Sequence, residues 1–312
     1  MAKTVIPNRP VPELDPVNDA RHVLADEPLA RESVPYVFCI PEHKIAALVY
    51  TWVNKASQAG AVFAAFGPGV GDQPIVEHIP DREVPASQNF DDWRVGSFYL
   101  RQDLKLKNAE FGIDTPRAGL QCRFEALHPA YAYGFHPDGC PRWAAHNRLE
   151  QAGRISGTLR LGDRTITFST TGARDHSWGT RDWLTPQHWK WLHAQADGVC
   201  VHAWQINAYG RTDLRGYVFR EGRMAEITEV DTDFKVDAQY RQTHIDSLVT
   251  DSAGRTTRVT GEYFAVFPLL PGPQTTLNEG AMECRIDGKP GVGWTEFQWP
   301  TDYLKHLTST AP

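Results

Sequence analysis

Short runs of alternating apolar and polar residues, bounded by Gly, Pro, Asp and Asn, follow one another through most of this chain. A period of two residues is typical of strands that bury one face. We therefore predict β-strands throughout the N-terminal half. The clearest runs there are residues 45–53 (IAALVYTWV), 61–66 (AVFAAF), 96–104 (GSFYLRQDL) and 121–127 (QCRFEAL).

A sharper hairpin signal comes after an aromatic connector. The runs RISGTLRL and RTITFST flank the dipeptide Gly162-Asp163, which is typical of a two-residue turn. Such a turn fixes the register of the two strands. The predicted pairs on one face are Leu159 with Ile166 and Gly157 with Phe168.

Further strand-turn-strand units continue from residue 188 to residue 299, and almost no segment has a convincing period of 3.6 residues. Many short strands at regular spacing predict an all-β fold, and the chain is too long for one eight-stranded barrel. We predict two consecutive antiparallel barrels or sandwiches after an extended, proline-rich arm with a short helix near residues 20–30. The predicted parts are the arm (1–34), a first domain (35–150) and a second domain (151–312).

Composition then narrows the class of protein. The 312 residues carry a net charge of -6 without a long basic run, which argues against a nucleic-acid partner. No stretch approaches the roughly 18 apolar residues of a membrane helix, so we expect no integral membrane segment. The five cysteines are scattered and form no C-x-x-C pair, which favours free thiols in the cytoplasm.

Tryptophan and histidine gather in one region. Five of the ten Trp and four of the twelve His lie between residues 174 and 204. If Asp197-Gly198 is a two-residue turn, the strands on either side pair residue by residue and place these side chains on one face. The predicted pairs are His193 with His202, Trp191 with Trp204, Gln195 with Cys200 and Trp189 with Ile206.

This face suggests a site for a hydrophobic small molecule, because large aromatic walls with a few polar groups are typical of ligand cavities. The alternative is that the aromatic side chains simply fill a barrel. We predict that substrate is bound by Gln195, Trp189, Trp191 and Trp204 of this face, together with Trp178 and Trp183 of the preceding segment.

The segment GARDHSWGTRDW (172–183) adds charges to this region. An Arg fork can neutralise a buried carboxylate, so we interpret Arg174, Arg181 and Asp182 as a structural charge seam. Asp175 and His176 differ, because adjacent residues of a strand point to opposite faces and need not form a catalytic pair.

Known motifs for other chemistries are missing. The chain has no G-x-S-x-G, no P-loop and no G-x-G-x-x-G after a strand, so we expect no organic cofactor. Histidines such as His176 and His188 could ligate a metal, yet no H-E-x-x-H or comparable spacing is present. We expect no metal.

The sequence Asp175-His176-Ser177-Trp178-Gly179, after a G-x-(I/L)-x-L-G-D hairpin, resembles the Asp-x-x-Trp-Gly signature of carotenoid 1,2-hydratase (hydroxyneurosporene synthase) and its relatives. The longer motif RDHSWG is similar to that of uncharacterised bacterial members. The resemblance implies a tandem lipocalin-like architecture that holds a hydrophobic ligand. It also implies hydration, isomerisation or cyclisation of unsaturated hydrocarbon skeletons. The two Arg-Asp steps depart from the hydratase pattern, so the carotenoid itself does not carry over.

The residues are compatible with such chemistry. A carboxylic acid desolvated by aromatic walls can protonate an alkene, and Asp175 is our candidate. Tryptophan faces would stabilise the resulting cation, and His176, His193 or His202 would deprotonate it or position water.

We therefore predict a lyase or isomerase: a hydratase, dehydratase, double-bond isomerase or cyclase acting on a terpenoid, a steroid or a similar substrate. Two alternatives remain. One is a non-catalytic lipocalin-type carrier of the same ligands. The other is a structural or partner-binding β-protein.

Overall fold

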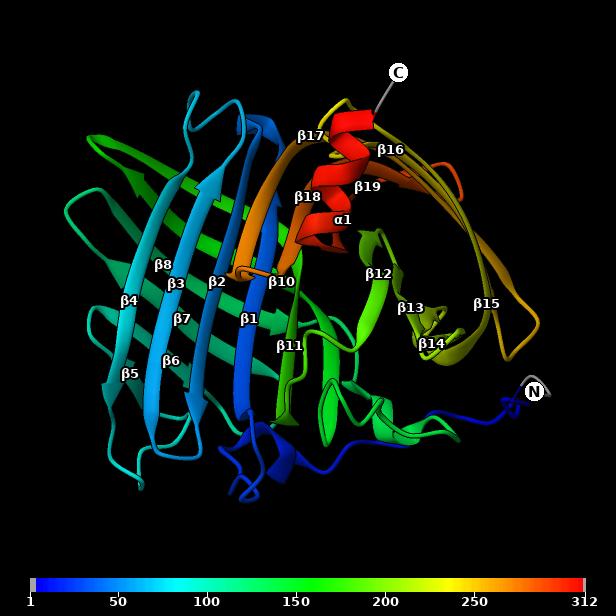
Figure 1. Cartoon of the computed structure of the whole chain (residues 1–312), viewed down its shortest axis with the longest axis horizontal. Helices are drawn as coiled ribbons and strands as arrows, with labels where there is room; N and C mark the ends of the chain where they lie inside the picture. Colours follow the sequence, from blue (N-terminus) through cyan, green and yellow to red (C-terminus); the bar gives the residue numbers. More distant parts are fainter. Residues whose placement is uncertain (1–3, 311–312) are drawn as a thin grey trace. The chain divides into compact units, whose positions relative to one another are not determined.

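The computed structural model describes residues 4–310, and its chain divides into two compact units (Figure 1). We name the first the sheet unit (Pro12–Phe135 and Gly139–Arg181) and the second the barrel unit (Met1–Val11, His136–Asp138 and Asp182–Pro312). Nearly all regular structure is antiparallel β, so the all-β prediction is confirmed. Among the described residues, no helix has the length and apolar character needed to cross a membrane.

The sheet unit contains one sheet with the strand order β4-β3-β2-β1-β11-β10-β8-β7-β6-β5, and β9 pairs with β10. Short 3-10 helices η1 (Pro16–Asp19), η2 (Pro41–His43) and η3 (Tyr133–Phe135) accompany it. The strands are β1 (Ala30–Ile40), β2 (Ile45–Asn54), β3 (Gln58–Phe66), β4 (Ile75–Glu83), β5 (Trp93–Val95), β6 (Phe98–Gln102), β7 (Asn108–Asp114), β8 (Ala118–Ala126), β9 (Tyr131–Ala132), β10 (Asn147–Leu161) and β11 (Arg164–Thr180).

The first and last long strands of this sheet, β1 and β11, are neighbours in its middle (Figure 1). The two halves of the sheet face each other and enclose one core, which includes Phe38, Phe63, Phe111 and Phe124. The alternation of each strand explains this core, because residues two apart point to the same face.

The β10–β11 hairpin has the predicted register: Leu159 pairs with Ile166 and Gly157 pairs with Phe168. Gly162 lies in the turn with φ 57°, a conformation that glycine adopts easily. The hairpin belongs entirely to the first sheet, so the division between units falls at residue 181 rather than near residue 150. We predicted the boundary at the connector that precedes this hairpin. The strands on its two sides, β8 and β10, nevertheless pair with each other in one sheet.

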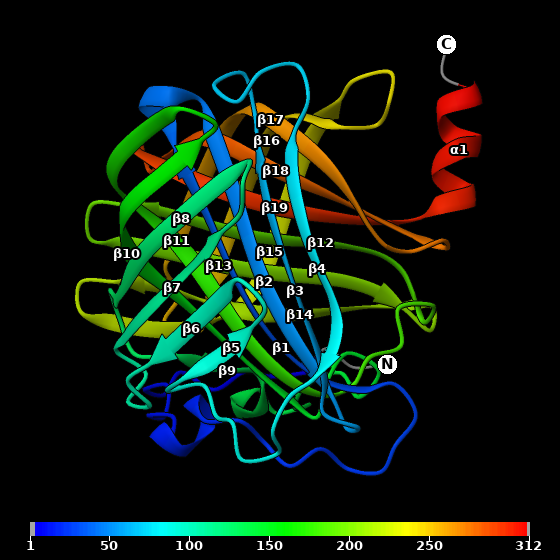
Figure 2. The ribbon, with the colours of Figure 1, turned by 90° about the vertical axis from the view of Figure 1, so that its left-hand side faces the viewer.

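The barrel unit is a closed barrel in which consecutive strands pair and β12 also pairs with β19. The strands are β12 (Pro186–Ala196), β13 (Val199–Ala208), β14 (Arg211–Arg220), β15 (Arg223–Val236), β16 (Gln242–Asp251), β17 (Thr256–Gly272), β18 (Thr275–Ile286) and β19 (Lys289–Pro300). Its interior is a second hydrophobic core. Helix α1 (Thr301–Thr310) continues directly from β19 (Figure 2) and packs Leu304 and Leu307 against that core.

The N-terminal segment differs from the prediction in one respect. No helix forms near residues 20–30; the helical turn is η1, where the side chain of Asp15 accepts a hydrogen bond from the Val17 amide. The following residues are irregular, and some of their polar groups bond to the loop between β4 and β5. Arg21, for example, donates hydrogen bonds to the carbonyls of Pro85 and Gln88.

Candidate functional site

Strand β11 contains most of the segment GARDHSWGTRDW (172–183) and divides its side chains between the two faces of the sheet. Arg174, His176 and Trp178 alternate with Asp175 and Ser177, so Asp175 and His176 point in opposite directions, as the sequence predicts. The alternation therefore splits these residues between two separate polar clusters within the sheet unit.

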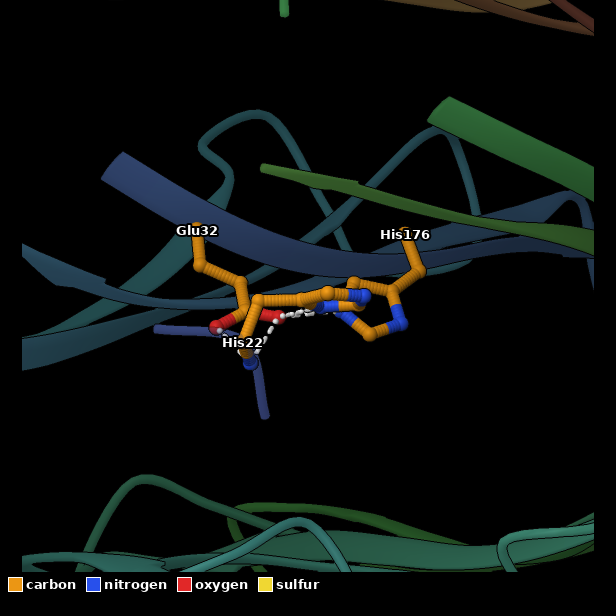
Figure 3. Close-up of side chains that lie close together, drawn as sticks. All are labelled: His22, Glu32 and His176. Atoms are coloured by element: carbon orange, nitrogen blue, oxygen red, sulfur yellow. Dashed lines mark hydrogen bonds and ion pairs between the residues drawn. The ribbon is translucent and has the colours of Figure 1, made fainter. Parts of the chain in front are cut away.

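The first cluster joins His176 to Glu32 of β1 and His22 of the N-terminal segment (Figure 3). His176 Nε2 and His22 Nδ1 each lie 2.7 Å from Glu32 Oε1. The main-chain N–H of His22 also donates to both carboxylate oxygens, at 3.1 and 3.0 Å. Glu32 and His176 are fully buried, whereas the His22 side chain is 20% exposed. The cluster therefore reaches from the interior toward solvent through His22.

Aromatic rings surround these imidazoles. Trp178 stacks on His22 with ring centroids 3.7 Å apart, and Phe90 meets the His176 ring edge to face at 5.2 Å. Such walls exclude water and strengthen the electrostatic interactions between the enclosed groups.

The charge of Glu32 is set by its two imidazole partners. Burial opposes its ionisation, but the hydrogen bonds from His176 and His22 outweigh burial and hold the pKa of the carboxyl below its usual value. A carboxylate can only accept, so Nε2 of His176 carries the proton of this hydrogen bond. Nδ1 of His176 is buried and has no hydrogen-bond partner among residues 4–310. The arrangement is that of a base oriented by a carboxylate.

The same three side chains offer a donor set that could hold a metal ion. Their nearest ligand atoms all lie within 4.8 Å of one another, and two imidazoles with one carboxylate are used by zinc and non-haem iron sites. Both imidazoles nevertheless contact the same oxygen at hydrogen-bond distance. A metal ion would have to replace both of these bonds.

Arg174 lies deeper on the same face. Its Nη1 contacts Asp19 Oδ1 and Gln102 Oε1, each at 2.9 Å, and its Nε contacts Gln151 Oε1 at 3.0 Å. The guanidinium and the Asp19 carboxylate are both buried, so the charge of Arg174 is compensated by the N-terminal segment and not by its sequence neighbour.

Asp175 belongs to the second cluster. Arg148 Nη2 lies 2.8 Å from Asp175 Oδ2, and Arg148 Nε lies 2.5 Å from Glu150 Oε1. Burial alone would lower the pKa of Arg148, but the carboxylates of Asp175 and Glu150 raise it well above its usual value. An arginine partner of this kind favours the charged carboxylate. The predicted role of Asp175, protonation of an alkene, requires the neutral acid.

The remaining residues of the predicted charge seam have separate surroundings. Arg181 donates to the hydroxyl of Ser177, and burial lowers the pKa of its guanidinium. Asp182 accepts hydrogen bonds from the Leu184 amide and the Thr185 hydroxyl, which form a turn before β12.

The other predicted residues lie in the barrel unit, and their register is confirmed. The pairs are His193 with His202, Trp191 with Trp204, Gln195 with Cys200 and Trp189 with Ile206.

The neighbouring residues Leu192 and Ala203 belong to the barrel core, so the Trp and His side chains occupy the opposite face of these strands. They are buried there, and the rings of His193 and His202 stack at 4.2 Å. Trp183 contacts Trp189, whose indole N–H donates to Glu296.

The site contains two residues that the sequence did not single out, Glu32 and His22. The only signal for Glu32 is an acidic residue within the otherwise largely apolar strand ARESVPYVFCI. His22 belongs to a segment without a periodic pattern. Both become recognisable once β1 pairs with β11, which places Glu32 opposite Trp178.

With two antiparallel sheets, one of them a closed barrel, the chain has an all-β, lipocalin-like fold. Residues 15–301 match the family "Domain of unknown function (DUF7064)", and the chain belongs to that family. No protein among the curated sequences matches it.

Solved structures with a similar fold include a putative AttH from Nitrosomonas europaea, with 15% identity, a TM-score of 0.62, and coverage of 94% of this chain and 99% of that chain. CghA with Sch210972 has 14% identity, a TM-score of 0.61, and coverage of 86% and 88%. Kievitone hydratase from Nectria haematococca has 10% identity, a TM-score of 0.60, and coverage of 95% of each chain.

Proposed function

We propose that this protein is a lyase or isomerase that moves a proton on a hydrophobic, unsaturated substrate such as a terpenoid or a steroid. The observation that carries the proposal is the buried His176, whose Nε2 is held by Glu32 while its Nδ1 has no partner. The names of two similar structures are compatible with this class: one is a hydratase, and the other was crystallised with the small molecule Sch210972.

In the proposed reaction, His176 Nδ1 removes an allylic proton or a proton next to a carbonyl group. Glu32 stabilises the imidazolium that forms and fixes the ring. Return of the proton to another carbon gives isomerisation, and its delivery to a hydroxyl leaving group gives dehydration. His22, which contacts the same carboxylate oxygen and is partly exposed, lets the pair exchange protons with solvent.

The proposal keeps His176 from the candidates predicted by the sequence and assigns the carboxylate role to Glu32. Asp175 becomes an ion-pair partner of Arg148. His193 and His202 remain candidates for contacts with substrate in the barrel unit, together with Trp191 and Trp204.

The test is hydrogen exchange, which does not require the natural substrate to be known. The protein is incubated in D₂O with 5-androstene-3,17-dione and with geraniol, and deuterium uptake, double-bond migration and gain or loss of water are followed by mass spectrometry. We expect uptake or conversion with the wild type and a loss of about 10²–10⁴-fold in H176Q, because a positioned base contributes that much. E32Q should also lose activity, because glutamine can neither hold the same tautomer of His176 nor stabilise its imidazolium.

The control is H244Q. His244 also contacts a glutamate, Glu262, at 2.7 Å, but this pair lies on the surface. The control variant should behave as the wild type. Unchanged exchange in H176Q would contradict the catalytic assignment. Binding of both probes without any exchange would favour a carrier.

A further inference from the structure

One end of the barrel interior carries polar groups that the acid–base proposal does not use. In an antiparallel barrel, the first residues of β12 and the last residues of β15 and β19 lie at the same end. His188 and Lys190 begin β12, Phe234 is near the end of β15, and Phe297 and Trp299 are near the end of β19. We name these five residues the mouth cluster. Barrel mouths are a common place for small-molecule sites.

The ammonium group of Lys190 has no carboxylate partner among the described residues. Its Nζ lies 5.2 Å from the ring centroid of Phe234 and 5.9 Å from that of Phe297. Within the described part of the chain it forms no ion pair with a carboxylate, and burial lowers the pKa of its ammonium group. A half-buried ammonium that contacts only aromatic faces keeps its hydrogen-bond donors available for a ligand.

His188 and Trp299 add two more unpartnered groups. Their rings lie 4.1 Å apart, centroid to centroid. His188 Nδ1 lies 2.5 Å from the carbonyl oxygen of Gln298, so this nitrogen carries the proton and Nε2 is an acceptor. His188 Nε2 and Trp299 Nε1 are both buried, and neither has a hydrogen-bond partner in the part of the chain that the structure describes. Because buried polar groups are normally hydrogen-bonded, two orphaned atoms in contacting rings indicate a missing partner.

From these contacts we infer that the mouth cluster binds the carboxyl group of an apolar organic acid, with Lys190 as its counter-ion. This site is contained in the barrel unit and shares no residue with the His176 site. It therefore goes beyond the proposed function and can be tested independently of it.

A carboxyl group complements each unpartnered group in the cluster. When the acid binds, its proton moves to His188 Nε2, and the carboxylate oxygens then accept hydrogen bonds from this N–H, the Lys190 ammonium and the Trp299 indole N–H. The rings of Phe234, Phe297 and Trp299 offer contacts to an apolar body. Leu304 and Leu307 of α1 pack against the same barrel core and add apolar surface.

The experiment compares an acid with its neutral ester. The full chain is titrated at pH 7 with cis-parinaric acid and with methyl cis-parinarate, and probe fluorescence reports binding. We expect the acid to bind at least about tenfold more tightly than the ester, because the ester loses a charge-assisted hydrogen bond. In K190M the two probes should bind equally. W299F, which keeps a ring and removes the N–H, should weaken binding of the acid more than binding of the ester.

The matched control is K235M, which removes an exposed lysine from β15 and should keep the preference for the acid. Circular dichroism checks the fold of each variant. If K190M does not fold, the affinities of the wild type and W299F for acid and ester still test whether the mouth cluster binds a carboxyl group. Equal affinity of the wild type for acid and ester, no binding of either probe, or an unchanged preference in folded K190M would overturn the inference.

Discussion

The two units differ in the partners that their interiors offer to charged side chains. In the sheet unit, Arg174 is paired with Asp19, and Glu32 accepts hydrogen bonds from two imidazoles, so each buried charge has its partners within the chain. In the barrel unit, Asp251 is likewise paired with Arg255, but the ammonium group of Lys190 lies over the rings of Phe234 and Phe297 and has no carboxylate partner among the described residues. The comparison teaches that similar β-structures can use buried polar residues either for internal cohesion or for a partner that the chain itself does not supply.

The largest expected effect concerns the compensated charge of the sheet unit. In D19A, Arg174 would remain buried without its carboxylate, and breaking one side of a buried pair costs about 3–5 kcal/mol of unfolding free energy. Denaturant unfolding measures this loss. The control is D26A in the same N-terminal segment, where Asp26 contacts Lys55 at the surface and little should change. If D19A lost no more unfolding free energy than D26A, the Asp19–Arg174 ion pair would not be what holds the N-terminal segment on the sheet unit.

A smaller effect is expected for His188 as the pH falls. Burial, and then the charge of Lys190, lower the pKa of His188 to about 4. Below about pH 6.5 the unfolded chain therefore takes up a proton that the folded protein does not, and stability decreases until about pH 4. The full shift corresponds to about 3 kcal/mol, at about 1.4 kcal/mol per unit.

In H188F this part of the decrease should disappear, whereas the part from His136, whose pKa burial also lowers to about 4, should remain. Unfolding curves at several pH values give the comparison. Substitution of the exposed His306 by Gln is the control. The same pH dependence in wild type and H188F would show that His188 is not held neutral in the folded barrel.

The smallest effect is expected for H22F. Phenylalanine can keep the stacking on Trp178, but it removes one of the side-chain hydrogen bonds to Glu32. The carboxylate would still be bonded to His176 and to the main chain, so we expect a loss of about 1 kcal/mol in unfolding free energy.

H22F should also alter the acid side of the stability curve. A carboxyl with a lowered pKa stabilises the folded state above the ordinary glutamate pKa, and this contribution is lost as the pH falls through the folded value. With one bond removed, the loss on acidification should be smaller than in the wild type. If stability fell on acidification by the same amount in H22F and in the wild type, His22 would not help to keep Glu32 charged.

The sequence predicts the strands and their registers well, because alternation and short turns are local signals. The turns at Gly162 and Gly198 fixed every predicted pair of the β10–β11 and β12–β13 hairpins. Local signals do not report which hairpin joins which sheet. The pairing of β10 with β8 across an irregular connector therefore placed the division between units later than the composition suggested.

The candidate site was predictable only in part for the same reason. His176 stands in a recognisable motif, but its partner Glu32 lies 144 positions earlier in a strand without any signature. A buried pair of this kind depends on which distant strands become neighbours. His188 and Trp299 likewise meet only because β12 and β19 close the barrel.

The pairing of β1 with β11 also has a consequence for synthesis on the ribosome. Asp19 and its partner Arg174 are 155 positions apart, so at about 5–20 residues per second Arg174 is added about 8–30 s after Asp19. During this interval β1 can form a hairpin with β2, but its other edge has no strand to pair with. An unpaired edge is a template for association with other chains. The nascent chain would therefore gain from a chaperone that covers β1 until β11 has been made.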